Sequence, residues 1–153
     1  MSIEINNESG VSLDENQLQR LAAYVLDSLH VHPQTELGIS LVDEGAIERL
    51  HVDWMDEPGP TDVLSFPMDE LRPGRPDAAT PAGLLGDVVI CPQVAEVQAD
   101  AAGHDTQIEV CILLTHGMLH LLGFDHANPV DEAEMFGLQR DLVASFLSRE
   151  QRK

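Results

Sequence analysis

Apolar and polar positions alternate with a period of two in several short segments, which is the pattern of half-buried strands. Residues 3–5 show this pattern first, and further strand patterns begin at Glu36 and Thr61. A fourth segment, from Leu84, is almost continuously apolar, which is typical of a strand that is covered on both faces. The sequence therefore predicts four strands in one small sheet.

Between and after these strands, apolar residues recur at helical spacing. A first helix is predicted to begin at Asp14. Its inward-facing positions are Leu18, Leu21, Ala22, Val25 and Leu29. A short helix is predicted over residues 43–51. Proline at position 92 suits the first turn of a third helix, over residues 92–102, and Gly103 is expected to close it.

Two longer helices are predicted in the last third of the chain. Thr106 and Glu109 form a capping-box pattern at the start of a strongly apolar helix, which is expected to run to about Leu122 and to stop at Gly123. A last helix is predicted to begin near residue 128. Its buried stripe is expected to consist of Met135, Leu138, Leu142 and Phe146.

This order of elements, with strands early and helices late, indicates an α+β fold in which a small mixed four-stranded sheet packs with about five helices. Residues 67–83 are rich in proline and glycine. We interpret them as a long loop and not as a linker, because neither side of the segment looks complete alone. The whole chain, residues 1–153, is expected to form one domain with its own core.

Composition and charge narrow the class of protein. No stretch approaches the roughly 20 apolar residues that a membrane helix needs, and the start of the chain lacks the pattern of a secretory signal, which favours the cytoplasm. Cys91 and Cys111 are too few for a disulfide framework and are expected to be reduced and packed. The net charge of −19 argues against nucleic acid, although a bound divalent cation can supply positive charge locally.

Three of the seven histidines lie in the segment THGMLHLLGFDH. His116 and His120 are four residues apart on a predicted helix, so that their Cβ atoms are expected about 5–6 Å apart on one face. Gly123 allows the chain to turn back and to bring His126 to the same point. Three imidazoles leave a fourth position for water, which is typical of catalytic zinc, although nickel, copper or iron could also bind. The sequence therefore predicts one Zn²⁺ per chain.

The spacing of these histidines coincides with that of the metzincin metalloproteases. Those enzymes have a glutamate directly after the first histidine as general base, and this chain has Gly117 there. Peptide hydrolysis by that mechanism is therefore not expected. Asp125, next to His126, could orient a ligand imidazole, take a proton from water, or only cap a turn.

Together with PTDVLSFP at residues 60–67 and GDVVIC at residues 86–91, the histidine motif resembles the YbeY family of bacterial single-strand-specific endoribonucleases over nearly the whole chain. The resemblance implies that the three histidines bind a catalytic zinc and that single-stranded RNA is the substrate. It further implies a role in ribosomal RNA maturation and ribosome quality control, with ribosomal subunits or proteins as partners. It also implies that residues 61–66 border the cleft, where Ser65 could face the substrate or the strand could simply be core.

The chain departs from the family pattern in one place. Many family members have an arginine, usually after tyrosine, six residues before the threonine of the TDVLSF segment, and that arginine is thought to contact RNA phosphate. Trp54 and Met55 stand there in this chain. Trp54 could stack on a base or pack. A phosphate anchor must come from elsewhere, and the candidates are Arg72 and Arg75 in the predicted loop, unless they are only solvated charges.

Three functions therefore stay open on sequence grounds. The leading one is metal-dependent hydrolysis of a phosphodiester in single-stranded RNA. A metallopeptidase or amidase would share the histidine helix, but the chain lacks its glutamate. A non-catalytic, zinc-containing ribosome-associated factor would suit the strong acidity of the chain, because a negative surface complements basic ribosomal proteins.

Overall fold

The structure is a computed structural model that describes residues 2–55 and 61–151, with the side chains at positions 54 and 55 outside the described part. Four strands in these residues form one sheet in the order β1-β2-β4-β3. The strands are β1 (Ser2–Asn7), β2 (Glu36–Leu41), β3 (Val63–Pro67) and β4 (Leu84–Ile90). β1, β2 and β4 run parallel, and β3 is antiparallel to β4. The predicted small mixed sheet is confirmed.

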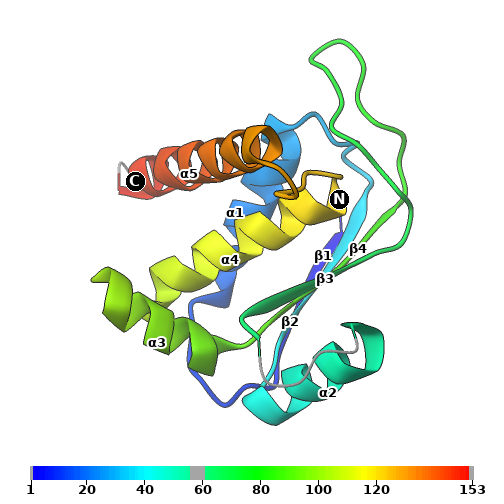
Figure 1. Ribbon diagram of the computed structural model, residues 1–153. Helices are drawn as coiled ribbons and strands as arrows, with labels where there is room; N and C mark the ends of the chain where they lie inside the picture. The colour runs from blue at the N-terminus through cyan, green and yellow to red at the C-terminus, as the bar shows by residue number, and fades with distance from the viewer. Residues whose placement is uncertain (1, 56–60, 152–153) are drawn as a thin grey trace.

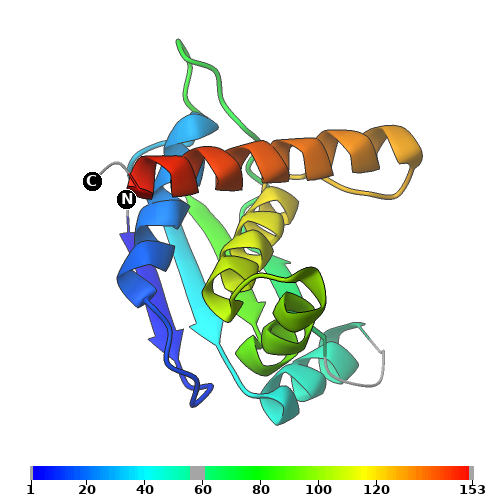
Figure 2. The same ribbon diagram turned by 90° about the vertical axis from the view of Figure 1, so that its left-hand side faces the viewer.

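The described residues form five helices, so the predicted α+β fold is also confirmed. These helices are α1 (Glu15–Ser28), α2 (Glu44–Met55), α3 (Pro92–Ala102), α4 (Thr106–Leu121) and α5 (Pro129–Gln151). Figures 1 and 2 show α1, α4 and α5 on one side of the sheet and α2 on the other. None of the helices in the part of the chain that the structure describes has the length and apolar character needed to cross a membrane.

The main core lies between the sheet and the helices α1, α4 and α5. Val88 of β4 packs into this core, whereas its neighbour Val89 packs with Ile47 of α2 on the opposite face of the sheet. β4 is therefore covered on both faces, which explains its almost continuous apolar sequence. Both cysteines are free and buried, as the sequence predicted. The predicted stripe of α5 is confirmed as well, because Met135, Leu142 and Phe146 are buried and Leu138 packs against the core.

Side-chain caps fix the start of several helices. Asp14 caps α1 as predicted, because its Oδ1 accepts a hydrogen bond from the backbone N–H of Gln17 at 3.0 Å. Asp43 makes the equivalent bond to the N–H of Ala46 at 2.8 Å. Each cap satisfies a backbone donor that has no partner within the helix.

The capping box that the sequence predicts at Thr106 is wrong. Asp105 is the cap of α4, since its Oδ1 accepts from the N–H of Ile108 at 2.8 Å, and Thr106 is already helical. Glu109 contacts His104 instead, with 2.6 Å between its Oε1 and the Nε2 of that histidine. The physical reason is that aspartate is among the strongest N-caps, so that the helix begins one residue earlier, directly after Asp105.

Residues 68–83 form the predicted long loop between β3 and β4, which Figure 1 shows extending beyond the end of the sheet. The N–H of Gly74 donates to the carbonyl oxygen of Leu29 at 2.9 Å, and the N–H of Thr80 donates to that of His30 at 3.1 Å. These bonds attach the loop to the turn after α1. At the tip, the backbones of Arg75 and Ala78 pair with each other.

Candidate metal centre

The fold leaves α4 open along one narrow stripe. From Glu109 to its last residue, every position of this helix is buried except Ile112, His116 and His120, which are partly exposed. These three positions are each four residues apart and therefore lie on one face. The two histidines face a cleft, and their Nε2 atoms are 3.1 Å apart. From Glu109 onward, the apolar character of the helix thus leaves the two imidazoles on its one partly exposed stripe.

A tight turn brings the third imidazole to the same place. Gly123, with φ of +94°, ends the helix, and its N–H donates to the carbonyl oxygen of His120 at 3.0 Å. Asp125 Oδ1 then accepts a hydrogen bond from the backbone N–H of His126 at 2.6 Å. The ring of His126 lies 5.8 Å from that of His116 and 5.3 Å from that of His120, measured between centroids. Asp125 therefore holds the backbone of the turn.

The three imidazoles fit the demands of a metal ion. One nitrogen from each of them lies within 4.8 Å of the other two. Two nitrogens that bind one zinc at about 2.0–2.1 Å with tetrahedral angles lie roughly 3.3 Å apart, close to the 3.1 Å between the two Nε2 atoms. The cluster of His116, His120 and His126 could therefore hold a metal ion.

The protonation of the site also favours a metal. Burial lowers the pKa of His116 below its usual value, and the nearby His126 lowers it further, although Gln139 and Asp62 oppose this. Burial likewise lowers the pKa of His120, with the other two histidines adding to the effect. Since a metal binds the neutral imidazole, a lowered pKa extends metal binding to lower pH.

One member of the site comes from α5 and has no signal in the sequence. The Nδ1–H of His116 donates to Oε1 of Gln139 at 2.8 Å. This bond fixes the tautomer of His116 so that its Nε2 is free to bind a metal. Only the packing of α5 against α4 brings Gln139 to this place, so spacing along the chain could not reveal it.

The histidines open into a cleft of about 600 Å³ that β3 borders. It is lined by His51, Thr61, Asp62, Val63, Leu64, Ser65, Pro67, His116, His120 and His126. Ser65 lies in the cleft as expected from the TDVLSF segment, and its hydroxyl group donates to the carbonyl oxygen of Gly117 at 3.0 Å.

Two further residues of the cleft, His51 and Asp62, were not predicted from the sequence. Asp62 accepts bonds from the N–H of Val63 at 2.7 Å and from Gln98 at 3.1 Å.

Close packing of α4 on the sheet explains the glycine that follows the first histidine. A Cβ atom placed on Gly117 would lie 2.6 Å from Cγ1 of Val88 and 3.2 Å from Oγ of Ser65. Real side chains do not approach so closely, so this position has no room for a glutamate. The missing glutamate of the metalloprotease pattern is therefore a consequence of the packing in this fold.

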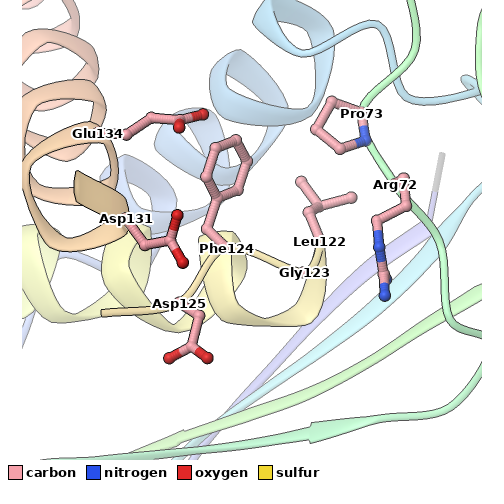
Figure 3. A pocket seen from close by; sticks show the side chains of 8 residues that line it. All are labelled: Arg72, Pro73, Leu122, Gly123, Phe124, Asp125, Asp131 and Glu134. Atoms are coloured by element: carbon pink, nitrogen blue, oxygen red, sulfur yellow. The ribbon is translucent and has the colours of Figure 1, made fainter. Parts of the chain in front are cut away.

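A second hollow, of about 260 Å³, adjoins residues 122–125, the turn that precedes His126 in the chain (Figure 3). It is lined by Arg72, Pro73, Leu122, Gly123, Phe124, Asp125, Asp131 and Glu134. Arg72 lies against the turn, because a Cβ on Gly123 would be 2.6 Å from its Nε. Arg75 lies at the loop tip, where its backbone pairs with Ala78. Of the two candidate arginines, the structure brings Arg72 next to the metal-site turn.

Comparison with known proteins decides the family. Residues 3–147 match the family model described as Endoribonuclease YbeY. The chain belongs to the YbeY family. It is 69% identical over 150 residues to the endoribonuclease YbeY of Clavibacter sepedonicus, with 98% of each chain covered. It is 67% identical over 146 residues to that of Leifsonia xyli subsp. xyli, with 95% of each covered.

The likeness extends to a solved structure. A Thermotoga maritima protein studied in solution matches 98% of this chain and 92% of its own, with a TM-score of 0.65 and 23% identity. At this identity the match supports the fold alone. The resemblance to the YbeY family, inferred from the histidine motif and the two strand segments, is confirmed by the family match.

The departure from the YbeY pattern at Trp54 and Met55 concerns side chains that lie outside the described residues. In the part of the chain that the structure describes, no arginine or lysine lines the cleft of the three histidines. Arg72 of the long loop contacts the turn between His120 and His126, because a Cβ atom on Gly123 would lie 2.6 Å from its Nε.

Proposed function

We propose that this YbeY-family protein is a zinc-dependent endoribonuclease that cleaves single-stranded RNA. The observation that carries the proposal is the convergence of His116, His120 and His126 at the edge of an open cleft. An open cleft admits an extended strand, and three imidazoles leave a coordination position for water or substrate. Relatives that are named endoribonucleases support RNA as the substrate.

Zinc held by the three histidines would supply a Lewis acid for a phosphoryl oxygen and would lower the pKa of bound water toward about 7. The protein's own residues prepare the site for this chemistry. Gln139 orients His116 through its Nδ1 atom, and Asp125 fixes the backbone of His126. Ser65 joins β3 to α4 through the carbonyl group of Gly117, which sets the width of the cleft beside the metal ligands. We assign Asp125 and Ser65 positioning roles.

Arg72 is the proposed contact for RNA phosphate. Its guanidinium group lies on the turn at Gly123, between the last histidine of α4 and His126. A positive charge on this turn would bind a phosphate group of the strand that passes the three histidines. Arg75, at the loop tip, is the second candidate.

We further propose that the protein works in the cytoplasm in ribosomal RNA maturation and ribosome quality control. The net charge of −19 suits docking on basic ribosomal proteins. Cosedimentation with ribosomal subunits would support this partner. If the protein cosediments with subunits but cuts no naked RNA, it is a non-catalytic ribosome-associated factor.

No peptidase activity is proposed, because Gly117 has no room for a glutamate side chain. A casein digest is therefore expected to be negative.

The central test is cleavage of a fluorescent single-stranded RNA by the purified protein. Treatment with EDTA is expected to abolish cleavage and added Zn²⁺ to restore it, whereas His116→Ala is expected to stay inactive with zinc present. His32→Ala removes an imidazole from the turn before β2 and is the matched control, which should cleave normally. Cleavage that survives both EDTA and His116→Ala would refute the proposal.

A further inference from the structure

Phe136 of α5 is an exposed aromatic side chain beside the candidate metal centre. Its exposed fraction is 38%, and it is the one aromatic residue among the large hydrophobic residues that are exposed in the described part of the chain. Exposure alone would mean little, because single apolar side chains are common on protein surfaces. The position of this ring gives the exposure its significance.

The ring lies over two of the proposed metal ligands. Its centroid is 5.6 Å from that of His116 with 25° between the planes, and 5.8 Å from that of His126 with 40° between the planes. Phe136 precedes Gln139 by three residues on α5, so both side chains point from the same face of this helix. Gln139 binds an edge of the His116 ring, and Phe136 lies nearly parallel to that ring and remains open to solvent.

We propose that Phe136 is a stacking platform for a base of the RNA strand, next to the phosphodiester at the metal site. The inference rests on the proposed function and adds a residue that contacts a base of the RNA substrate. An aromatic ring can stack on any base, because every base has a π face. Bases in a duplex are already stacked on their neighbours, so a platform of this kind favours single strands.

The charge of the chain makes such a contact important. With a net charge of −19 and no arginine or lysine lining the described part of the cleft, phosphate contacts can supply only a small part of the affinity. Stacking does not depend on charge and adds affinity without counterion release. Phe136 would therefore contribute binding that does not change with salt, and Arg72 would contribute the part that does.

The test distinguishes the contribution of the bases to binding affinity from the contribution of the sugar-phosphate backbone. Binding of a short 2′-O-methyl oligoadenylate, and of an abasic strand of the same length, is measured by fluorescence anisotropy at several salt concentrations with the zinc-loaded protein. For Phe136→Leu we expect about tenfold weaker binding of oligoadenylate, unchanged binding of the abasic strand, and an unchanged salt dependence. Phe136→Tyr keeps an aromatic ring and should bind oligoadenylate as tightly as the unaltered protein. Arg72→Ala should weaken both strands alike and reduce the salt dependence.

Zinc content of each variant is measured in parallel. If Phe136→Leu binds oligoadenylate as tightly as the unaltered protein, the platform is refuted. If it loses zinc, or weakens both strands equally, Phe136 only supports the histidines and the inference is also refuted. These results leave cleavage by the unaltered protein in place, so that they are distinct from a failure of the proposed function, in which the unaltered protein neither binds nor cleaves RNA.

Discussion

Gln139 of α5 accepts a hydrogen bond from the Nδ1–H group of His116 on α4, with 2.8 Å between the two atoms. The bond couples the last helix of the chain to the first of the proposed ligands. Acceptors of this kind fix the tautomer and the orientation of a ligand imidazole, and they make its other nitrogen a better ligand. The proposed metal site would therefore depend on a residue that does not itself bind the ion.

Replacing Gln139 by leucine should lower the affinity for zinc by about 10- to 100-fold, because His116 loses the acceptor that holds its ring. Gln139→Glu keeps an acceptor in the same place and should retain tight binding. The measurement is competition for zinc with a coloured chelator. Gln107→Leu, which removes hydrogen bonds to Asp14 and Gln17 far from the site, is the control and should bind zinc normally. Equal affinities for the two leucine variants would contradict the role of Gln139.

Gly117 provides a test of how tightly α4 packs on the sheet. Alanine is ordinarily better than glycine inside a helix by about 1 kcal/mol, but its Cβ would lie 2.6 Å from Val88. Overpacking of this kind costs roughly 1–3 kcal/mol. We therefore expect Gly117→Ala to lower the free energy of unfolding by up to about 2 kcal/mol, after the gain in propensity is subtracted.

The matched control is Gly137→Ala in α5, where the nearest atom to the new Cβ is Arg140 Nη2 at 3.9 Å. With no clash, this variant should become more stable, by up to about 1 kcal/mol. Urea denaturation of both variants measures the difference. If the two substitutions change stability in the same direction, the close contact between α4 and β4 does not limit this position.

The clustering of the three histidines could be predicted from the sequence because it depends on local geometry. Histidines four residues apart share one face of any helix, and a glycine after the helix permits the turn that leads to His126. The strands and most helix limits followed from hydrophobic periodicity in the same way. The error at Thr106 shows the limit of such patterns, since Asp105, one residue earlier, caps the helix through the N–H of Ile108.

The residues around the ligands could not be predicted, because tertiary packing brings them there. Gln139 and Phe136 reach the histidines from α5. The apolar periodicity of α5 predicts which face of this helix is buried, but it does not predict which residues its other positions contact. His51 reaches the cleft from α2. The packing reason for Gly117 was likewise hidden, because the sequence shows the absence of a glutamate but not the contact with Val88 that excludes one.

The two cysteines should be inert in the folded protein. Burial raises the pKa of Cys111 to about 12, with nearby carboxylates adding to the effect, and burial also raises the pKa of Cys91. The reactive form is the thiolate, which therefore stays scarce until the pH approaches these raised values. Iodoacetamide at neutral or mildly alkaline pH should leave both thiols unmodified in the native state and modify both in urea, as mass spectrometry would detect. Rapid alkylation of the native protein would contradict this.

Arg72 and Arg75 should differ in their effect on RNA. Arg72 lies against Gly123 at the metal-site turn, whereas Arg75 lies at the tip of the loop. We expect Arg72→Ala to weaken binding of single-stranded RNA and to reduce the slope of log affinity against log salt concentration by about one, because one phosphate contact is lost. Arg75→Ala should change neither. Anisotropy titrations over a range of salt concentrations measure both quantities. If the two variants lose affinity equally, the loop binds RNA through its overall charge. The contact of Arg72 with the turn then makes no specific contribution to the affinity for RNA.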